Sequence, residues 1–347
     1  MRRILFAIMA SALMCSCTKP TQNKPMPDPE PDPKPVEVAF AKGADISWVT
    51  EMEDKGYKFY DASGKEKDCT VLMKELGFNS IRLRVWVDPK DGYCNQSDVL
   101  LKAKRASALG LKVMIDFHYS DSWADPSKQN IPAAWKGHDA SQLATDVAEH
   151  TKEVLTSLKL LGVDVGWVQI GNEVTGGFLW DLCKVSGKEA ANFIKCFNAG
   201  SDEVKKLYPD AKVVLHVDNG WKMDTLNWFY GLMGSAKYDI IGLSLYPSYW
   251  ENGAYGDWNA KTKQCMNNIT SLNATYHKEV MIVEFGMPAS QPEKAKDALQ
   301  FILDNASDKP YFKGIFLWEP EAEHSRNNYD YGAFADGKPT IALDPIK

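Results

Sequence analysis

The chain has 347 residues, of which 44% are hydrophobic and 25% are charged, and its formal net charge is −6. This composition is typical of a globular protein with a sizeable core, in one large domain or two small ones. The negative charge and the lack of a basic stripe argue against a nucleic-acid partner. The 11 Trp and 14 Tyr residues fit either core packing or flat platforms for sugar rings, and composition alone does not separate these two uses.

The first residues carry a targeting signal. A short basic start is followed by an apolar run over residues 4–14 that is too short to span a bilayer, and then by Cys15-Ser16-Cys17. This order resembles a bacterial lipoprotein signal over residues 1–17, with the lipid on Cys17; a plain secretory signal is the alternative. We therefore expect membrane attachment through Cys17, at the outer membrane and cell surface of a Gram-negative bacterium.

The next segment reads as a spacer over residues 18–35. Proline alternates with Asp, Glu and Lys in residues 26–35, a composition that favours extended polyproline and cannot pack a core. The folded domain is therefore expected over residues 36–347.

Five cysteines remain after the signal. An exported, oxidising setting favours disulfides, and the odd number allows one or two of them while leaving the pairing open. Mostly buried thiols are the other interpretation, and no pair has the spacing of a zinc site. The five residues are Cys69, Cys94, Cys183, Cys196 and Cys265.

Eight short β-type runs alternate with helix-like segments. Residues 142–162 and 292–305 carry apolar side chains at helical spacing, and Leu-Gly pairs such as Leu161-Gly162 mark helix ends. This repetition predicts an α/β fold, a single-domain (β/α)8 TIM barrel. A doubly wound open sheet is the competitor, but no glycine-rich phosphate loop follows the first run. The runs are residues 42–47, 80–87, 112–119, 166–173, 212–218, 240–246, 280–286 and 314–320.

In such barrels the active site lies at the carboxyl ends of the strands. Glu173 ends the fourth run and Glu284 the seventh, so the two carboxylates are expected to face each other across the barrel mouth. Cleavage of a glycosidic bond with retention needs two carboxylates about 5–5.5 Å apart, one as acid/base and one as nucleophile. We assign Glu173 as the acid/base and Glu284 as the nucleophile.

Other polar residues at the strand ends suit supporting roles. Asn172 is suited to bind a sugar 2-hydroxyl, while Arg84 and Tyr246 are suited to hold Glu284 ionised and aimed. His118 and His216 are the residues that a metal-dependent hydrolase would use, but the first run lacks the His-x-His that such a site requires. We therefore expect no catalytic metal.

At this point the sequence resembles the clan A (β/α)8 glycosidases, and more narrowly glycoside hydrolase family 53, the endo-β-1,4-galactanases. The resemblance spans residues 40–344, and the stretch Asp116 to Pro126 is its most specific part. The other motifs are Gly43-Ala44-Asp45-Ile46-Ser47, Arg82-Leu83-Arg84-Val85-Trp86, Gln169-Ile170-Gly171-Asn172-Glu173 and Trp318-Glu319-Pro320.

The resemblance implies a retaining arabinogalactan endo-β-1,4-galactanase that hydrolyses the galactan side chains of pectin. Some bacterial members bind structural calcium in an enlarged loop after the seventh strand. Only residues 287–293 follow Glu284's strand here, which argues against that calcium, so no cofactor is expected. We expect a monomer whose partner is β-1,4-galactan. The residues that should contact the sugar are Asp45, Arg84, Trp86, His118, Trp123, Asn172, Tyr246 and Trp318.

Two other functions stay open on the sequence. One is a different clan A endo-glycanase, such as a β-mannanase. The other is a non-catalytic surface glycan-binding protein, against which the intact Glu173 and Glu284 pair argues, because binding alone requires neither.

Overall fold

The computed structural model describes residues 38–347. The predicted signal over residues 1–17, with Cys17, and the spacer over residues 18–35 lie outside the described residues. Within residues 38–347, no helix has the length and apolar character needed to cross a membrane.

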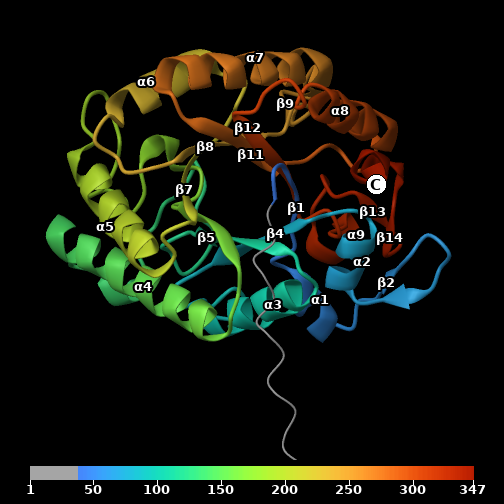
Figure 1. Ribbon diagram of the computed structural model, residues 1–347, viewed down its shortest axis with the longest axis horizontal. Coiled ribbons are helices and arrows are strands. Elements are labelled where there is room, and N and C mark those ends of the chain that lie inside the picture. Colours follow the sequence, from blue (N-terminus) through green and yellow to red (C-terminus); the bar gives the residue numbers. More distant parts are fainter. Residues whose placement is uncertain (1–37) are drawn as a thin grey trace, which may run out of the picture. The chain divides into compact units, whose positions relative to one another are not determined.

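Eight parallel strands close into a barrel, in the order β1-β12-β11-β8-β7-β6-β5-β4, as Figure 1 shows with the helices outside the ring. Every predicted run matches one of these strands within three residues at either end, so the (β/α)8 barrel is confirmed and the doubly wound sheet is wrong. The strands are β1 (Ala41–Asp45), β4 (Ser80–Val85), β5 (Lys112–Phe117), β6 (Val165–Ile170), β7 (Lys212–Val217), β8 (Ile240–Leu245), β11 (Glu279–Phe285) and β12 (Phe312–Trp318).

Helices follow the first seven barrel strands. The longest one, α4, begins at a capping box in which the Asp139 side chain accepts from the backbone of Gln142 and the Gln142 side chain accepts from the backbone of Asp139. Its predicted apolar face, which includes Leu143 and Val147, is buried. The helices are α1 (Val49–Asp54), α2 (Cys69–Glu75), α3 (Gln96–Ala108), α4 (Ala140–Leu160), α5 (Ala191–Leu207), α6 (Met223–Leu232), α7 (Trp258–Tyr276) and α8 (Pro292–Asp304).

The eighth unit departs from the regular repeat. After β12 come the one-turn helix α9 (His324–Asn327), the strand pair β13 (Phe334–Ala335) and β14 (Lys338–Pro339), and the 3-10 helix η3 (Ile341–Ile346). Pro345 lies inside η3 and has no backbone N–H to donate, so a regular α-helix cannot continue through it. The long helix expected of an eighth unit is therefore replaced by η3, which packs on α8.

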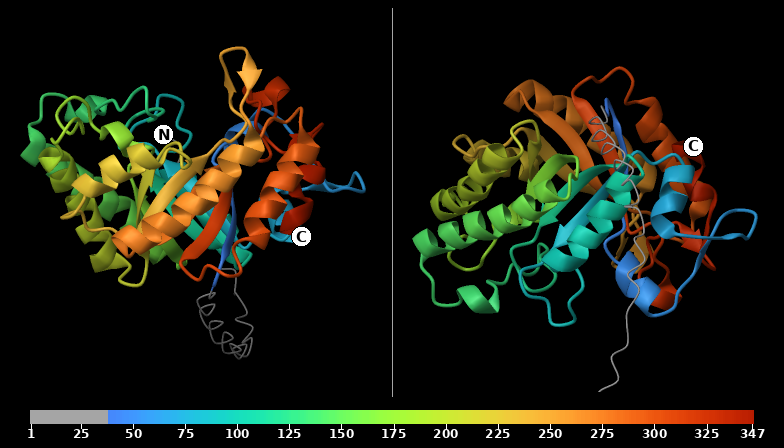
Figure 2. Two further views of the ribbon diagram at one scale, coloured as in Figure 1. Left: turned by 90° about the horizontal axis from the view of Figure 1, so that it is seen from above. Right: turned by 60° about the horizontal axis from the view of Figure 1, so that its bottom comes forward.

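Two further strand pairs interrupt the β/α alternation. The pair β2 (Phe59–Tyr60) and β3 (Glu66–Lys67) lies between α1 and α2, and β9 (Trp250–Glu251) with β10 (Ala254–Tyr255) forms a hairpin between β8 and α7. Figure 2 shows the β9–β10 hairpin projecting beyond the strands of the barrel.

The inside of the barrel is apolar at one end and polar at the other. Trp167 and Phe316 meet edge to face inside the barrel, with ring centroids 6.0 Å apart, in a buried cluster that also contains Met114 and Met281. Gly43 leaves room for Phe316, because a Cβ on Gly43 would lie 2.1 Å from that ring. Toward the carboxyl ends of the strands the interior side chains become charged, and this change of polarity marks the candidate site.

Candidate active site

Glu284 points into the barrel because β11 contains a bulge. Met281 and Val283 belong to the interior cluster, whereas Ile282 and Phe285 pack in the outer core. Strict alternation would place Glu284 outside as well, but the pairing of β11 with β8 shifts register between Ile282 and Glu284. A bulge of this kind re-aims a side chain next to an active site, and here it leaves Glu284 at the mouth with 5% exposure.

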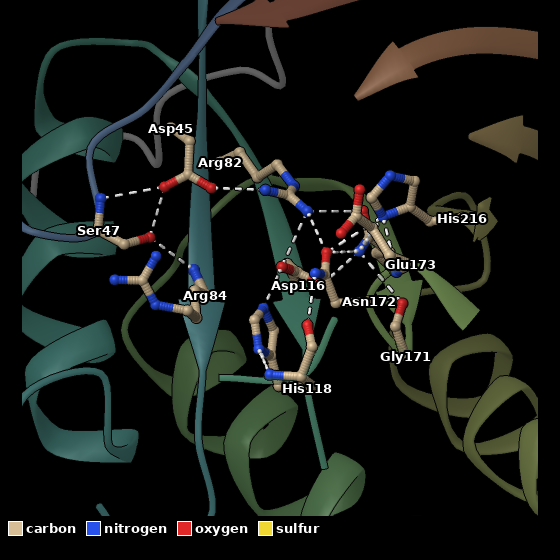
Figure 3. A network of polar contacts seen from close by, with 12 residues as sticks. Asp45, Ser47, Arg82, Arg84, Asp116, His118, Gly171, Asn172, Glu173 and His216 are labelled. Carbon is tan, nitrogen blue, oxygen red and sulfur yellow. Dashed lines mark hydrogen bonds and ion pairs between the residues drawn. The ribbon is translucent and has the colours of Figure 1, made fainter. Parts of the chain in front are cut away.

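Glu173 reaches the same mouth because the backbone turns sharply after β6. Gly171, directly after β6, has φ 81°, and Glu173 has φ 46° in the left-handed region. These two conformations break the alternation of β6, so that Asn172 and Glu173 both project into the site, as the close-up in Figure 3 shows. Positive φ at a non-glycine residue is costly and clusters at functional sites.

Arg82, rather than Arg84, holds Glu284. The Arg82 guanidinium is fully buried and donates to Glu284 Oε1 at 3.0 Å and to Asp45 Oδ2 at 2.7 Å. Its Nη2 also lies 2.9 Å from Asp116 Oδ2 and donates to Asn172 Oδ1 at 3.0 Å. The predicted contact between Arg84 and Glu284 is therefore wrong: Arg82 donates to Glu284, whereas Arg84 donates to Glu319. Figure 3 shows the two arginines on β4, with Arg82 toward Asp116 and Asn172.

Arg84 instead forms the base of an aromatic wall. Its Nη1 donates to Glu319 Oε1 at 3.1 Å, and its Cζ lies 4.2 Å from the ring centre of Trp123 and 5.0 Å from that of Trp86. Cation–π contacts of this kind stabilise desolvated guanidinium groups. Arg84 thus supports the tryptophans that were predicted to contact sugar.

The aromatic wall is continuous. Trp318 meets Trp123 at 5.8 Å and Trp48 at 5.1 Å between ring centroids, and Tyr329 meets Trp318 at 4.7 Å. The predicted residues Trp86, Trp123 and Trp318 are therefore brought together, each partly exposed. Sequence reasoning missed Trp48 and Tyr329, which come from the loops after β1 and β12.

The charge of Glu284 is balanced between opposing influences. Burial raises its pKa to about 7; Arg82 opposes this shift, Asp116 and Asp45 reinforce it, and the Tyr246 hydroxyl, which donates to Oε2 at 3.0 Å, lowers the pKa. Tyr246 therefore lies where it was predicted, against Glu284.

Glu173 stays protonated more readily than Glu284. Burial and the negative charge of Glu284 hold its pKa well above the ordinary value, with Asp218 adding to the effect. Its only side-chain donor among the described residues is Ser244 Oγ, at 2.7 Å from Oε1. Two interacting carboxyls whose pKa values are pushed apart are the arrangement that divides acid from base.

A histidine extends this contact behind Glu173. His216 Nδ1 accepts from the backbone N–H of Glu173 at 3.2 Å, and its Nε2 lies 2.8 Å from Ser244 Oγ. Since Nδ1 is an acceptor, the proton of the neutral ring is on Nε2 and is donated to Ser244. Burial lowers the pKa of His216 well below its usual value, which keeps the ring neutral.

His118 is a second neutral histidine. Its Nδ1 accepts from Trp86 Nε1 at 3.2 Å and from the backbone N–H of Ala124 at 3.3 Å, so Nε2 carries the proton, which it donates to Asp116 at 3.0 Å. Burial lowers its pKa. His118 therefore ties Trp86 to the polar centre of the barrel, in line with its predicted place at the site.

An open cleft of about 480 Å³ begins at Glu173. Its walls come from the loops after β5, β7 and β8. Within residues 38–347 no group of three or more His, Cys, Asp or Glu side chains is arranged to hold a metal ion. The lining residues are Asp125, Pro126, Ser127, Glu173, Asp218, Asn219, Trp221, Ser244, Tyr246, Tyr249 and Glu251.

The sequence pattern of a known family covers this whole arrangement. The pattern of glycosyl hydrolase family 53 matches residues 41–312, from β1 to the start of β12. The chain belongs to glycosyl hydrolase family 53. The expected family is thus confirmed, and all the polar strand ends described above except that of β12 lie inside the match.

Curated relatives match most of the chain. A probable arabinogalactan endo-β-1,4-galactanase A from Neosartorya fischeri is 34% identical over 305 residues, which is 80% of this chain and 83% of the relative. The arabinogalactan endo-β-1,4-galactanase of Humicola insolens is 33% identical over 311 residues, 82% of this chain and 91% of the relative.

Solved structures agree with the sequence comparison. A fungal β-1,4-galactanase superposes with a TM-score of 0.77 at 31% identity, covering 88% of this chain and 98% of the other. A family 10 endo-β-1,4-xylanase reaches a TM-score of 0.59 at 15% identity. This likeness shows only that the two proteins share the barrel fold.

Several residues of the site were given no catalytic or sugar-binding role by the sequence analysis. Their positions along the strands could have identified them. Each lies an even number of residues from another interior side chain of the same strand, so its side chain also faces inward. A polar residue at such a position is either a partner of the catalytic groups or an unsatisfied charge. These residues are Arg82, Asp116, Gln169, His216 and Ser244, to which the loop residue Glu319 is added.

Proposed function

We propose that the protein is an endo-acting, retaining arabinogalactan endo-β-1,4-galactanase. The observation that carries the proposal is the pair Glu173 and Glu284, two interacting carboxyls at one barrel mouth with different partners. Glu284 has a cation and a hydroxyl donor, whereas Glu173 has a single hydroxyl donor and an open cleft. The names of the relatives and of the fungal structure point to the substrate, β-1,4-galactan.

In the first step Glu284 attacks the anomeric carbon, and Glu173 gives its proton to the departing glycosidic oxygen. A glycosyl ester on Glu284 forms and the leaving sugar departs as an alcohol. In the second step Glu173, now ionised, takes a proton from water, whose oxygen attacks the same carbon and releases Glu284. Two inversions give net retention.

The electrostatics of the site follow this cycle. While Glu284 is charged, it raises the pKa of Glu173 and keeps the acid protonated. Once Glu284 is esterified its charge is gone, the pKa of Glu173 falls, and Glu173 becomes a base. The presence or absence of the charge on Glu284 therefore determines whether Glu173 acts as an acid or as a base.

The remaining predicted residues divide into polar contacts and walls. Asn172 Nδ2 donates to the backbone oxygen of Ala124 at 2.9 Å, and its second hydrogen is suited to a sugar 2-hydroxyl. Trp86, Trp123 and Trp318 offer apolar surface to sugar rings, while Asp45 acts through Arg82. No cofactor is part of the proposed reaction.

The experiment is substitution of each acid. Glu173→Gln and Glu284→Gln should each lower kcat on linear β-1,4-galactan by at least about 100-fold, with Glu189→Gln, an exposed acid, as the matched control. NMR of the first product should show the β anomer. Near wild-type activity of either glutamine variant would disprove the assignment, and a panel of mannan, xylan and cellulose derivatives tests the substrate.

We further propose that the protein is a monomer held at the outer membrane by a lipid on Cys17. This part rests on the sequence of residues 1–35 and on the size of the substrate, because a polymer cannot cross the outer membrane intact. Protease treatment of whole cells should remove the enzyme, and Cys17→Ala should release it to the soluble fraction.

A further inference from the structure

The β9–β10 hairpin carries an unusual concentration of exposed aromatic surface. Four aromatic side chains are strongly exposed among residues 38–347, and three of them lie within residues 249–255: Tyr249 at 47%, Trp250 at 52% and Tyr255 at 41%. Exposed aromatic groups in one place mark a binding surface more often than chance. Figure 2 shows this hairpin standing out from the barrel.

The hairpin is anchored and aimed rather than loose. Tyr249 stacks on Tyr331 with centroids 5.3 Å apart and planes 11° from parallel, and the Tyr331 hydroxyl accepts from the backbone N–H of Trp250 at 2.9 Å. Tyr331 in turn meets Tyr246, the residue that contacts Glu284, at 6.1 Å. A chain of aromatic rings therefore leads from the reacting centre to the hairpin.

The same hairpin forms one wall of the cleft at Glu173. Tyr249 and Glu251 line it, together with Asp125 and Asp218. Under the proposed function Glu173 protonates the departing oxygen, so the sugars that extend into this cleft are those of the leaving group. Glu284 does not line it.

We propose that the β9–β10 hairpin binds the leaving-group portion of a neutral galactan chain, with Tyr249 contacting its sugar rings. This proposal rests on the proposed function. The hairpin then determines the preferred substrate length and the affinity for substrate, whereas Glu173 and Glu284 carry out the chemical step.

The test compares two substrates. Linear β-1,4-galactan fills the cleft with sugars, whereas a 4-nitrophenyl glycoside of a β-1,4-galacto-oligosaccharide places only one small ring beyond the cleaved bond. Tyr249→Ala should lower kcat/KM on galactan about fivefold to tenfold and leave the nitrophenyl substrate within about twofold. Trp228→Ala, an exposed tryptophan outside the cleft, is the matched control.

Equal losses on both substrates, or no loss on galactan, would overturn the proposal. Melting temperatures of the variants separate a folding defect from a binding defect. If the wild type cleaves another glycan and not galactan, the proposed substrate fails. The effect of the hairpin substitution on kcat/KM is then measured on the glycan that is cleaved and on its nitrophenyl oligosaccharide. The difference between these two effects still decides the role of the hairpin.

A second inference rests on two buried thiols. Cys183 lies in the loop between β6 and α5, and Cys196 lies in α5. Both are fully buried, and their sulfur atoms are 3.3 Å apart. The loop that contains Cys183 also contains Glu173 and is closed on itself where the Val185 N–H donates to the oxygen of Gly176 at 2.9 Å.

We propose that Cys183 and Cys196 form a disulfide when the chain folds in an oxidising compartment. Each thiol loses its proton, the two sulfurs bond, and the two electrons reduce a disulfide oxidant to two thiols. A bond length of about 2.05 Å requires an approach of little more than 1 Å. The link ties the loop of the acid/base residue to α5.

Refolding of the full chain in glutathione and glutathione disulfide, followed by peptide mapping without reductant, tests this pairing. A linked peptide of Cys183 and Cys196 is expected, and a reductant should lower the melting temperature of the wild type by about 5 °C but not that of Cys183→Ser. Quantitative alkylation of both thiols before reduction would overturn the proposal. Cys265→Ser, another buried cysteine, is the control.

Discussion

Arg82 sets the electrostatics of the mouth at the scale of single residues. Its guanidinium lies within 3.0 Å of carboxylate oxygens of Asp45, Asp116 and Glu284. Burial raises the pKa of Glu284 to about 7, and Arg82, shared among three acids, opposes that shift only in part. The Tyr246 hydroxyl is the contact of Glu284 best suited to a test, because its removal, unlike removal of Arg82, does not leave buried carboxylates without their cation.

Tyr246→Phe should shift the acid limb of the pH–rate profile to higher pH. The Tyr246 hydrogen bond lowers the pKa of Glu284, so its loss raises that pKa, and Glu284 must be ionised to attack. We expect a shift of up to about one pH unit and a fall in kcat/KM of about tenfold. The measurement is kcat/KM on galactan against pH.

Tyr208→Phe is the control for this profile. It removes a hydroxyl that donates to the Val163 oxygen at 3.3 Å, away from the mouth. An unchanged acid limb in Tyr246→Phe, or an equal shift in Tyr208→Phe, would contradict the role of the Tyr246 hydroxyl.

At this scale the sequence predicted the identities but not the partners. Glu173 and Glu284 were recognisable because each ends an apolar run. Arg82 and Arg84, however, lie two residues apart on β4, so both side chains face the barrel interior. Alternation along the strand does not indicate how deep each side chain lies in the barrel. The choice between them depends on the tilt and closure of the strands, which only the folded barrel reveals.

At the scale of elements, the ends of β6 and β11 place the two acids by breaking the strand pattern. Gly171 permits the turn at the end of β6 since a side chain there would be strained at φ 81° and would place its Cβ 2.6 Å from Val174 Cγ1. The bulge in β11 has no such residue signature, so Glu284's inward direction could not be predicted from alternation.

Gly171→Ala should therefore impair both stability and activity. We expect a loss of about 1–2 kcal/mol in the free energy of unfolding and a fall in kcat of more than tenfold as Glu173 moves. Gly187→Ala is a matched control, because Gly187 also has positive φ, at 58°, but nothing lies within 4 Å of the added Cβ. Equal activity losses in the two variants would show that the position of Glu173 does not depend on Gly171.

The eight strands themselves were predictable because parallel barrel strands are buried on both faces and read as short apolar runs. The eighth unit was not predictable in its details. Residues 319–340 fold into α9 and the β13–β14 pair, whose shortness leaves no periodicity to detect. Glu319 and Tyr331, which support the site and the hairpin, come from this region.

The whole molecule buries an unusual group of carboxyls, and this has a consequence for its stability. Glu319 and Glu321 are fully buried beside each other. Burial, with the charge of Asp45, raises the pKa of Glu319 to about 7, and burial with the charge of Glu319 raises that of Glu321 well above its ordinary value. In the unfolded chain both carboxyls titrate near 4.5.

The sign of the pH dependence follows from these shifts. Above pH 4.5 the unfolded chain releases protons that the folded protein still holds, so the folded state binds more protons and the free energy of unfolding falls as the pH rises. Each such carboxyl contributes a slope of up to about 1.4 kcal/mol per pH unit. The stabilisation is complete below about pH 4.5 and is lost as the pH rises through about 7.

Glu321→Gln tests this dependence. Glutamine keeps the shape of the side chain and removes its titration at a fully buried position. Urea unfolding of the wild type should show a free energy that declines from pH 5 to pH 8, and the variant should decline less and be the more stable of the two at pH 8. Glu189→Gln, an exposed position, should keep the wild-type slope. Parallel curves for wild type and Glu321→Gln would mean that Glu321 is already ionised at neutral pH, and that its charge is compensated in the folded barrel.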